Sequence, residues 1–254
     1  MSRTARVKSS TDVYHIMLRG VNRQQIFFDD EDNYHFIHLL ESYKEISQYQ
    51  LYAYCLMGNH VHLLLRADGE PLETIFRRIG SAYVYWYNTK YERVGHLFQD
   101  RYKSEPVNDE RYFLTVLRYI LQNPVKAGFC NLPEEYPFSS AWDYLLPGHG
   151  FTDTEFVFQL IDRKAFRDFL KVDNEAVCMD ITDAHVRRWT DSAAKELIIK
   201  EFGTLTPLAG GKVNREELEA SIQRLLSKGL SIRQISRLAG VPRKIIERAS
   251  KSRN

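Results

Sequence analysis

The sequence predicts an α+β protein with a mostly helical C-terminal region, and three observations carry that prediction. Residues 1–130 alternate between short apolar runs and amphipathic stretches in the order β-α-β-β-α-β-α, the ferredoxin-like (split βαβ) order with one added helix. Residues 131–211 are acidic and contain helical stretches, such as TDSAAKELIIKEF, but no motif with an assignable role. Residues 212–254 are basic and hold two short helical patterns around a glycine turn, which predicts a helix-turn-helix. We therefore divide the chain into three regions with these bounds.

Apolar periodicity defines the elements of the first region. Strand patterns cover residues 13–20, 49–57, 59–66 and 101–107, and helical patterns cover residues 29–47, 71–91 and 109–123. The two middle strands meet at Gly58-Asn59, a dipeptide typical of tight turns. Pro124 disfavours helical geometry at the residue before it, so we expect the third helix to end there.

Capping residues define the C-terminal helices. The signals, in order, are an N-cap at Asn214, a stop at Gly229, a capping box of Ser231 with Gln234, a turn at Ala239-Gly240-Val241 and a helix start at Pro242. The stretch TPLAGGKVN, residues 206–214, reads as a linker before them.

Charge is unevenly distributed along the chain. Lys+Arg and Asp+Glu number 16 and 15 in residues 1–130, 8 and 14 in residues 131–211, and 11 and 4 in residues 212–254, which gives +1, −6 and +7. A basic terminal segment is typical of a nucleic-acid contact, and a solvated charged tail is the alternative. In the predicted helix-turn-helix the second helix would present Arg243, Lys244 and Arg248 to DNA, whereas a packing or protein-interaction module would not.

Composition excludes several classes of protein. No stretch approaches the roughly 20 apolar residues of a membrane span, and MSRTARVKSS lacks the apolar segment of a secretory signal. The three cysteines, Cys55, Cys130 and Cys178, match no metal or disulfide spacing, so we expect them to be reduced and structural. We expect a soluble intracellular protein, and the sequence leaves open whether it is a monomer or a dimer.

Two histidines lie one residue apart in an apolar strand pattern, LMGNHVHLLLR. Residues i and i+2 of a strand point to the same face, so His60 and His62 point the same way. Polar side chains on a central strand need a reason, and two imidazoles this close are able to bind one divalent cation. A third ligand must come from elsewhere, and a solvated strand face is the alternative.

The predicted helix at 109–123 offers partners for this pair. Tyr119 and Asn123 are four residues apart, so they share one helix face. Asn123 offers a carbonyl oxygen as a hard ligand and Tyr119 a phenol beside it, near the helix end whose dipole favours a cation. The alternative is an amphipathic tyrosine and an asparagine that only ends the helix.

Together these segments resemble a known family. HVH in an apolar strand, followed by Tyr119 in YILQNPVKAG, is similar to the HUH single-tyrosine transposases, and specifically to the REP-associated tyrosine transposases with their IS200-like domain. VYHIMLRGVNRQQIFFDDED and HLFQDRYKS also fit, so the resemblance covers about residues 10–130. Short members of the family lack a region like that beyond residue 131.

The resemblance implies a ferredoxin-like catalytic domain that binds Mg²⁺ or Mn²⁺ and cuts single-stranded DNA near hairpins. It implies His60, His62 and Asn123 as metal ligands and Tyr119 as the nucleophile. It also implies a bacterial cytoplasmic protein associated with the nucleoid. Imidazole ligands favour Mn²⁺ on affinity, and cellular abundance favours Mg²⁺.

Two other functions compete with this one. A DNA-binding regulator would work through the helix-turn-helix without catalysis, and a metal-dependent hydrolase would use water in place of Tyr119. Attack by a tyrosine would give a 5′-phosphotyrosine and a free 3′-hydroxyl, so the DNA strand could be resealed or transferred without ATP.

Contacts to single-stranded DNA require cations and aromatic platforms. The cations near the predicted strand ends are Arg19, Arg23, Arg101 and Lys103. The aromatic residues of the second helix are Tyr83, Tyr85, Trp86 and Tyr87, and we expect most of them to be core.

Overall fold

The computed structural model describes residues 6–146, 150–172, 178–179, 189, 191–208 and 214–251. The chain forms two compact units, one of residues 1–26 and 32–184 and the other of residues 27–31 and 185–254. It is an α+β protein: a four-stranded antiparallel sheet with helices precedes a mostly helical C-terminal region. The division of the chain into residues 1–130, 131–211 and 212–254 stays a prediction, because the two compact units do not test the role of each region. Residues 209–213 of the predicted linker lie outside the described residues.

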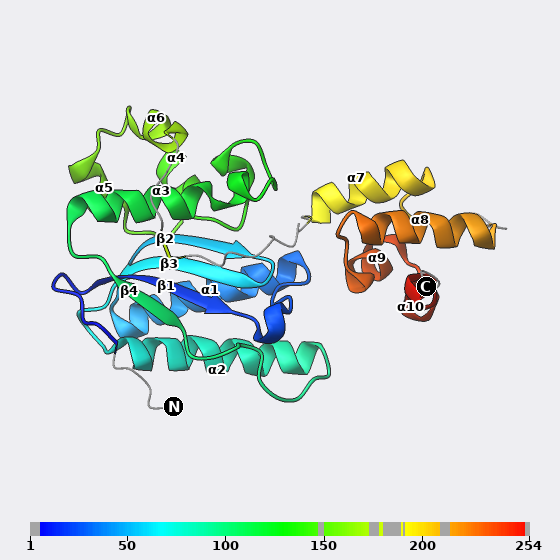
Figure 1. Ribbon diagram of the computed structural model, residues 1–254, viewed down its shortest axis with the longest axis horizontal. Coiled ribbons are helices and arrows are strands. Elements are labelled where there is room, and N and C mark those ends of the chain that lie inside the picture. Colours follow the sequence, from blue (N-terminus) through cyan, green and yellow to red (C-terminus); the bar gives the residue numbers. More distant parts are fainter. Residues whose placement is uncertain are drawn as a thin grey trace. The chain divides into compact units, whose positions relative to one another are not determined.

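The sheet of the first unit has the strand order β2-β3-β1-β4 with antiparallel neighbours (Figure 1). Its strands are β1 (Val13–Arg19), β2 (Gln50–Met57), β3 (His60–Arg66) and β4 (Lys103–Pro106). The strands β1 and β3 are the central pair, and nearly all of their residues are buried, as the apolar runs predicted. The predicted turn at Gly58-Asn59 joins β2 to β3.

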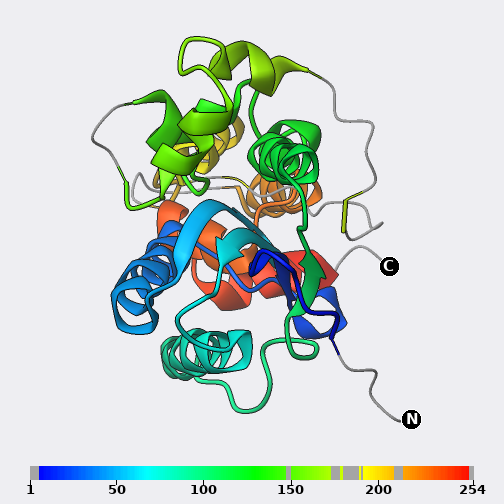
Figure 2. The same ribbon diagram turned by 90° about the vertical axis from the view of Figure 1, so that its left-hand side faces the viewer.

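Helices cover both faces of the sheet (Figure 1, Figure 2). The helices α1 (Asp30–Ser47) and α2 (Leu72–Lys90) lie on one face, and α3 (Glu110–Lys126) lies on the other, against β2 and β3. Asp109 caps α3, because its side chain accepts a hydrogen bond from the Tyr112 N–H at 2.8 Å.

The helix α3 runs three residues beyond its predicted end. Pro124 lies inside the helix, which continues to Lys126, and the Ala127 N–H still donates to the Asn123 carbonyl at 2.9 Å. Proline removes one backbone donor, and burial of the apolar face of α3 against the sheet outweighs that loss. The position of Pro124 had suggested that Tyr119 lies in the last turn of the helix. In the structure Tyr119 lies one turn before the last turn.

A tight loop follows β1. Gly20 leads into a short 3-10 helix, η1 (Val21–Arg23), in which Asn22 and Arg23 have positive φ angles of 50° and 60°. A Cβ on Gly20 would lie 2.2 Å from the Gln24 carbonyl oxygen, so only glycine fits this close approach.

Part of the acidic middle region belongs to the first unit. It contains η2 (Pro133–Glu135), α4 (Ala141–Leu145), α5 (Thr154–Leu160) and α6 (Phe166–Lys171). Its backbone runs along the outer edge of β2, where the Leu56 N–H donates to Phe138 at 2.9 Å and the Ser140 N–H donates to Tyr54 at 3.0 Å. This segment therefore covers a sheet edge that would otherwise be exposed to pairing with another chain.

The second unit contains α7 (Asp191–Phe202), α8 (Arg215–Ser227), α9 (Ile232–Ala239) and α10 (Arg243–Lys251). These helices share one apolar core. The predicted cap at Asn214 is confirmed, and the Gly229 N–H donates to Leu226 while the Leu230 N–H donates to Leu225, a Schellman motif. Ser231 caps α9, and Gly240 ends it in the left-handed conformation, both as predicted.

Candidate functional site

The site lies on the sheet face beneath α3. Strand pairing sets Met17 opposite His62 and Arg19 opposite His60, so the alternate residues of β1 and β3 share this face. His60 and His62 do point the same way: their ring centroids are 5.0 Å apart and the rings are nearly perpendicular. Both side chains are buried, at 2% and 0% exposure.

A third histidine joins the pair. His15 of β1 is fully buried, and its Nε2 lies 3.0 Å from Nδ1 of His62. On its other side, Nδ1 of His15 lies 3.5 Å from a carboxylate oxygen of Glu105 on β4. The contact with His15 and a hydrogen bond from Tyr112 lower the pKa of the Glu105 carboxyl. His15 interrupts the apolar pattern of its strand, which is a signal in the sequence, but it was not among the predicted site residues.

The ring of His60 is held by its neighbour in the chain. Nδ1 of His60 lies 2.7 Å from Oδ1 of Asn59. Nδ2 of Asn59 donates to the Arg23 carbonyl at 3.4 Å, and the amide oxygen of Asn59 therefore faces His60. His60 and His62 therefore each make a hydrogen bond through Nδ1, and Nε2 is the nitrogen of these two rings that is suited to ligation.

Tyr119 of α3 packs directly against the histidines. Its ring centroid lies 5.6 Å from that of His62 and 6.0 Å from that of His15, both edge to face. The ammonium of Lys126 lies 5.8 Å from the centre of the Tyr119 ring. Asn123 follows one turn later on α3 and is buried at 2% exposure. Among the described residues, no group of three His, Cys, Asp or Glu side chains is placed to hold a metal ion.

Residues 8–123 match the family model described as "Transposase IS200 like". This segment is an IS200-like transposase domain. It contains all four elements of the sheet and the histidines and tyrosine of the site.

Two solved structures are similar to the chain. One is a REP-associated tyrosine transposase bound to a REP hairpin, with 15% identity and a TM-score of 0.47 over 75% of this chain and 100% of that one. The other is a candidate transposase from Deinococcus radiodurans R1, with 19% identity and a TM-score of 0.34 over 47% of this chain and 95% of that one. Identities this low say nothing of substrate or activity. No curated protein matches the chain.

A basic cavity of the transposase domain includes Met17 and Arg19, the residues of β1 that pair with His62 and His60 of β3. Its volume is about 320 Å³, and it is lined by Arg6, Met17, Arg19, Gln99, Asp100, Arg101, Tyr102 and Lys103. Three of the four cations predicted near the strand ends, Arg19, Arg101 and Lys103, thus share one cavity. The fourth, Arg23, lies in the left-handed loop after β1. Arg6, whose guanidinium stacks on the Tyr102 ring at 3.9 Å from its centre, was not among the residues predicted to contact DNA.

Two of the four aromatic residues of α2 are core, whereas we expected most of them to be. Tyr83 and Tyr87 are core residues whose hydroxyls donate to the Ile26 carbonyl at 2.6 Å and the Gln25 carbonyl at 3.1 Å. Trp86 stacks on His35 with ring centroids 4.1 Å apart, and Tyr85 is 77% exposed. These residues belong to a helix on the opposite side of the sheet from α3, so they do not line the site of the transposase domain.

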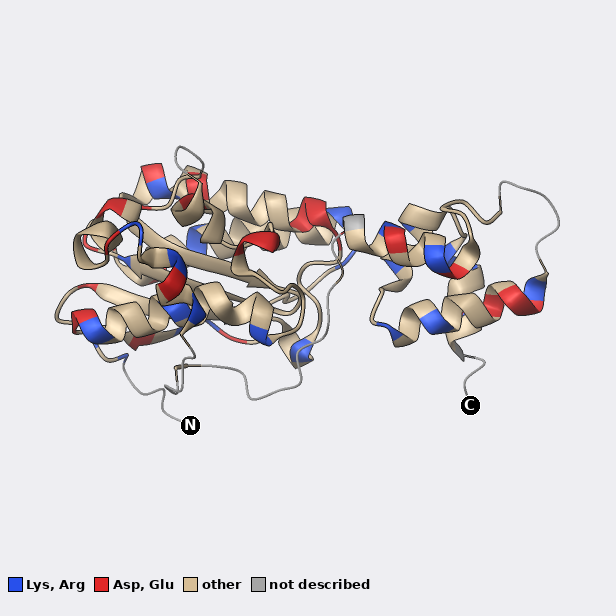
Figure 3. Ribbon diagram, turned by 90° about the horizontal axis from the view of Figure 1, so that it is seen from above, with Lys and Arg blue, Asp and Glu red and all other residues tan. Residues whose placement is uncertain are grey.

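In the second unit, the basic residues differ in their surroundings. Arg243 and Lys244 are exposed at the start of α10, whereas Arg248 pairs with Glu219 of α8 at 3.0 Å. Arg224 pairs with Glu201 at 2.7 Å, and acidic and basic residues are interspersed on the unit (Figure 3). The +7 charge of residues 212–254 is therefore partly balanced by neighbouring carboxylates.

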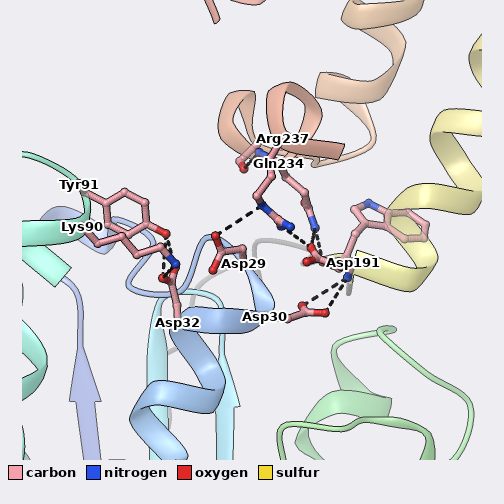
Figure 4. A network of polar contacts seen from close by, with 10 residues as sticks. Asp29, Asp30, Asp32, Lys90, Tyr91, Asp191, Gln234 and Arg237 are labelled. Carbon is pink, nitrogen blue, oxygen red and sulfur yellow. Dashed lines mark hydrogen bonds and ion pairs between the residues drawn. The ribbon is translucent and has the colours of Figure 1, made fainter. Parts of the chain in front are cut away.

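The segment Phe27–Glu31 takes part in a polar network of the second unit (Figure 4). Arg237 of α9 contacts Asp29 at 3.6 Å and Asp191 at 2.7 Å. Ser231 Oγ accepts from the Gln234 N–H at 3.0 Å, which confirms the Ser231 half of the predicted capping box, and Gln234 Nε2 donates to the Trp189 carbonyl at 2.8 Å. In the first unit, the carboxylate of Asp32 accepts from Lys90 at 2.8 Å and from Tyr91 at 2.7 Å.

Cys55, Cys130 and Cys178 form no disulfide. Among the described residues, no helix is long and apolar enough to cross a membrane.

Proposed function

We propose that this chain is a metal-dependent single-stranded DNA endonuclease and strand transferase that cleaves near DNA hairpins through a 5′-phosphotyrosine intermediate. The observation that carries the proposal is the packing of the Tyr119 ring against His62, since it brings a nucleophile to the histidine pair. Membership of residues 8–123 in a transposase family supports a DNA substrate. The hairpin, and kinship with REP-associated enzymes, rest on the sequence motifs.

The residues of the site fit a divalent cation. His60 and His62 are buried on one strand face, each oriented by a hydrogen bond through Nδ1, and Asn123 offers an amide oxygen from α3. This set would hold Mg²⁺ or Mn²⁺, with the imidazoles favouring Mn²⁺. When bound, such an ion supplies Lewis-acid polarisation of a nonbridging phosphate oxygen.

Tyr119 would supply the nucleophile. Its phenolic oxygen forms a bond to phosphorus as the bond to the 3′-oxygen of the upstream nucleotide breaks. The phenolic proton is lost to solvent, and the 3′-oxygen leaves as a hydroxyl after gaining a proton. Because one phosphodiester replaces another, the reverse reaction or attack by a second 3′-hydroxyl needs no ATP.

Arg19, Arg101 and Lys103 would hold the DNA backbone in the basic cavity. Arg23 would add a further cation from the loop after β1. We propose a ferredoxin-like fold for the catalytic domain. We also propose that α9 and α10 form a helix-turn-helix that binds DNA through the exposed Arg243 and Lys244. Arg248 would bind a phosphate only after leaving its ion pair with Glu219.

A labelled hairpin oligonucleotide with a single-stranded flank tests the proposal. In the presence of Mn²⁺ the label should migrate with the protein on a denaturing gel. Tyr85→Phe is the matched control, because it removes an exposed phenolic oxygen from α2 and should leave the adduct intact. A nicked oligonucleotide without adduct would indicate a water nucleophile, and binding with neither product would indicate a regulator that acts through α9 and α10.

A further inference from the structure

One buried group near the site has no role in the proposed chemistry. His15 is at 0% exposure on the central strand β1, between Glu105 and His62. A buried imidazole needs partners, and this one lies between a carboxylate and a second imidazole. We propose that His15 is a positioning residue that, together with Glu105, fixes the tautomer of His62. The inference rests on the proposed function of His62 as a metal ligand.

The direction of the hydrogen bonds follows from which atoms are able to donate. An ionised carboxylate only accepts, so Glu105, 3.5 Å from Nδ1 of His15, favours the proton on that nitrogen. A neutral His15 then carries its lone pair on Nε2. Nδ1 of His62 lies 3.0 Å from Nε2 of His15 and must therefore donate to its lone pair. His62 is left with its own lone pair on Nε2, the nitrogen that would bind a cation.

His60 reaches the same tautomer by a different route. The Asn59 amide oxygen accepts from Nδ1 of His60 at 2.7 Å, because the amide nitrogen is committed to the Arg23 carbonyl. The lone pair of His60 is therefore also on Nε2. Both histidines are held in the form needed by a metal ligand, one by a neighbouring amide and the other by His15 with Glu105.

Replacing His15 separates this role from simple packing. His15→Leu removes the acceptor for His62, whereas His15→Gln retains a carbonyl oxygen that is able to accept the same hydrogen bond. Ile16→Val is the control, since Ile16 is equally buried on the same strand and points to the opposite face. Mn²⁺ affinity is measured without DNA on the full chain, from the electron paramagnetic resonance signal of free Mn²⁺, so that the readout does not depend on cleavage.

We expect His15→Leu to weaken Mn²⁺ binding about 10- to 100-fold. His15→Gln should bind within a few fold of wild type, and Ile16→Val should bind as wild type. If folded His15→Leu binds Mn²⁺ as tightly as wild type, or if His15→Gln is as weak as His15→Leu, the positioning role is overturned. Failure of the wild type itself to bind Mn²⁺ would overturn the proposed metal site instead.

A measurement on the wild type does not depend on the folding of any variant. In metal-free protein labelled with ¹⁵N-histidine, nuclear magnetic resonance distinguishes the protonated from the unprotonated ring nitrogen. The proposal expects a proton on Nδ1 and none on Nε2 of His62, and a proton on Nδ1 of His15. The opposite tautomer at His62 would overturn it.

Discussion

Tyr119 gains its proposed role from its position on α3. A phenol with a pKa near 10 is only about 0.1% ionised at pH 7, so a tyrosine needs a site around it to act as a nucleophile. Here the ring is 6% exposed and packs against two imidazoles. Its neighbours, more than its exposure, distinguish it from the other tyrosines of the chain.

Replacing this tyrosine should separate cleavage from binding. Tyr119→Phe removes one oxygen and no charge, so we expect it to abolish cleavage while hairpin affinity stays within a few fold of wild type. Gel-shift titration measures the affinity, and a cleavage time course with the same oligonucleotide measures the activity. Cleavage at a near wild-type rate would assign the attack to water.

The histidine pair should be equally necessary. His60→Ala and His62→Ala should each remove most activity, because either change takes away one proposed ligand. Chelation should inactivate the wild type, and added Mn²⁺ should restore it. His38→Ala, a histidine on α1 outside the site, is the matched control. Full activity in excess chelator would exclude a metal from the mechanism.

At the scale of residues, the sequence predicted those site residues that share one face of a single strand or a single helix. His60 with His62, and Tyr119 with Asn123, are pairs of this kind. His15 and Glu105 were missed because they come from β1 and β4, and their meeting with His62 depends on the strand order, which one strand does not reveal. Arg6 was missed because it lies before the first predicted strand.

At the scale of elements, the types and order in the first unit follow from periodicity, while boundaries depend on packing. The end of α3 shows this, since Pro124 would end an isolated helix but is tolerated in one buried against the sheet. The acidic stretch from Pro133 to Lys171 gave only helical patterns. Its contact with the edge of β2 is made through backbone groups, which no side-chain pattern records.

The stability of the ion pairs that join α7 to the C-terminal end of α8 should depend on pH. Hydrogen bonds from Lys228 and Arg224 hold the pKa of the Glu201 carboxyl below its usual range. The native pKa is thus lower than the unfolded one, so the stabilisation is present above about pH 4.3 and is lost as the pH falls through the native value. Protection of the α7 and α8 amides from hydrogen exchange should decrease over this acidic range.

Glu201→Gln should flatten this dependence, because the titrating group is gone. Glu196→Gln, which changes an exposed glutamate on the same helix, should preserve it. If wild type and Glu201→Gln lost protection in parallel, other groups would govern the acid response of this unit.

At the scale of the whole molecule, the basic C-terminal segment is expected to contribute to DNA binding. Removing everything after residue 211 would also strip α7 of its core partners, since Ala194 and Ile198 pack with α8 and α9. The sharper change is Arg243→Ala with Lys244→Ala, which takes two exposed charges from α10 and leaves the core intact.

This double variant should bind DNA more weakly and with a flatter salt dependence. The slope of log affinity against log salt should fall by about 0.9 for each lost phosphate contact on duplex DNA, or about 0.7 on a single strand. Lys195→Ala with Lys200→Ala removes the same charge from exposed positions on α7. Equal effects of the two double variants would mean that only net charge matters and that α10 makes no specific contact.

The polarity of the covalent intermediate tests the central claim most directly. If Tyr119 attacks phosphorus and the 3′-oxygen departs, the protein stays joined to the 5′ phosphate of the downstream fragment. A substrate labelled at its 3′ end should then shift to a protein-sized band on a denaturing gel, and the same substrate labelled at its 5′ end should yield only a shortened oligonucleotide. The opposite pattern would mean a 3′-phosphotyrosine and would contradict the proposed mechanism even if Tyr119 proved essential.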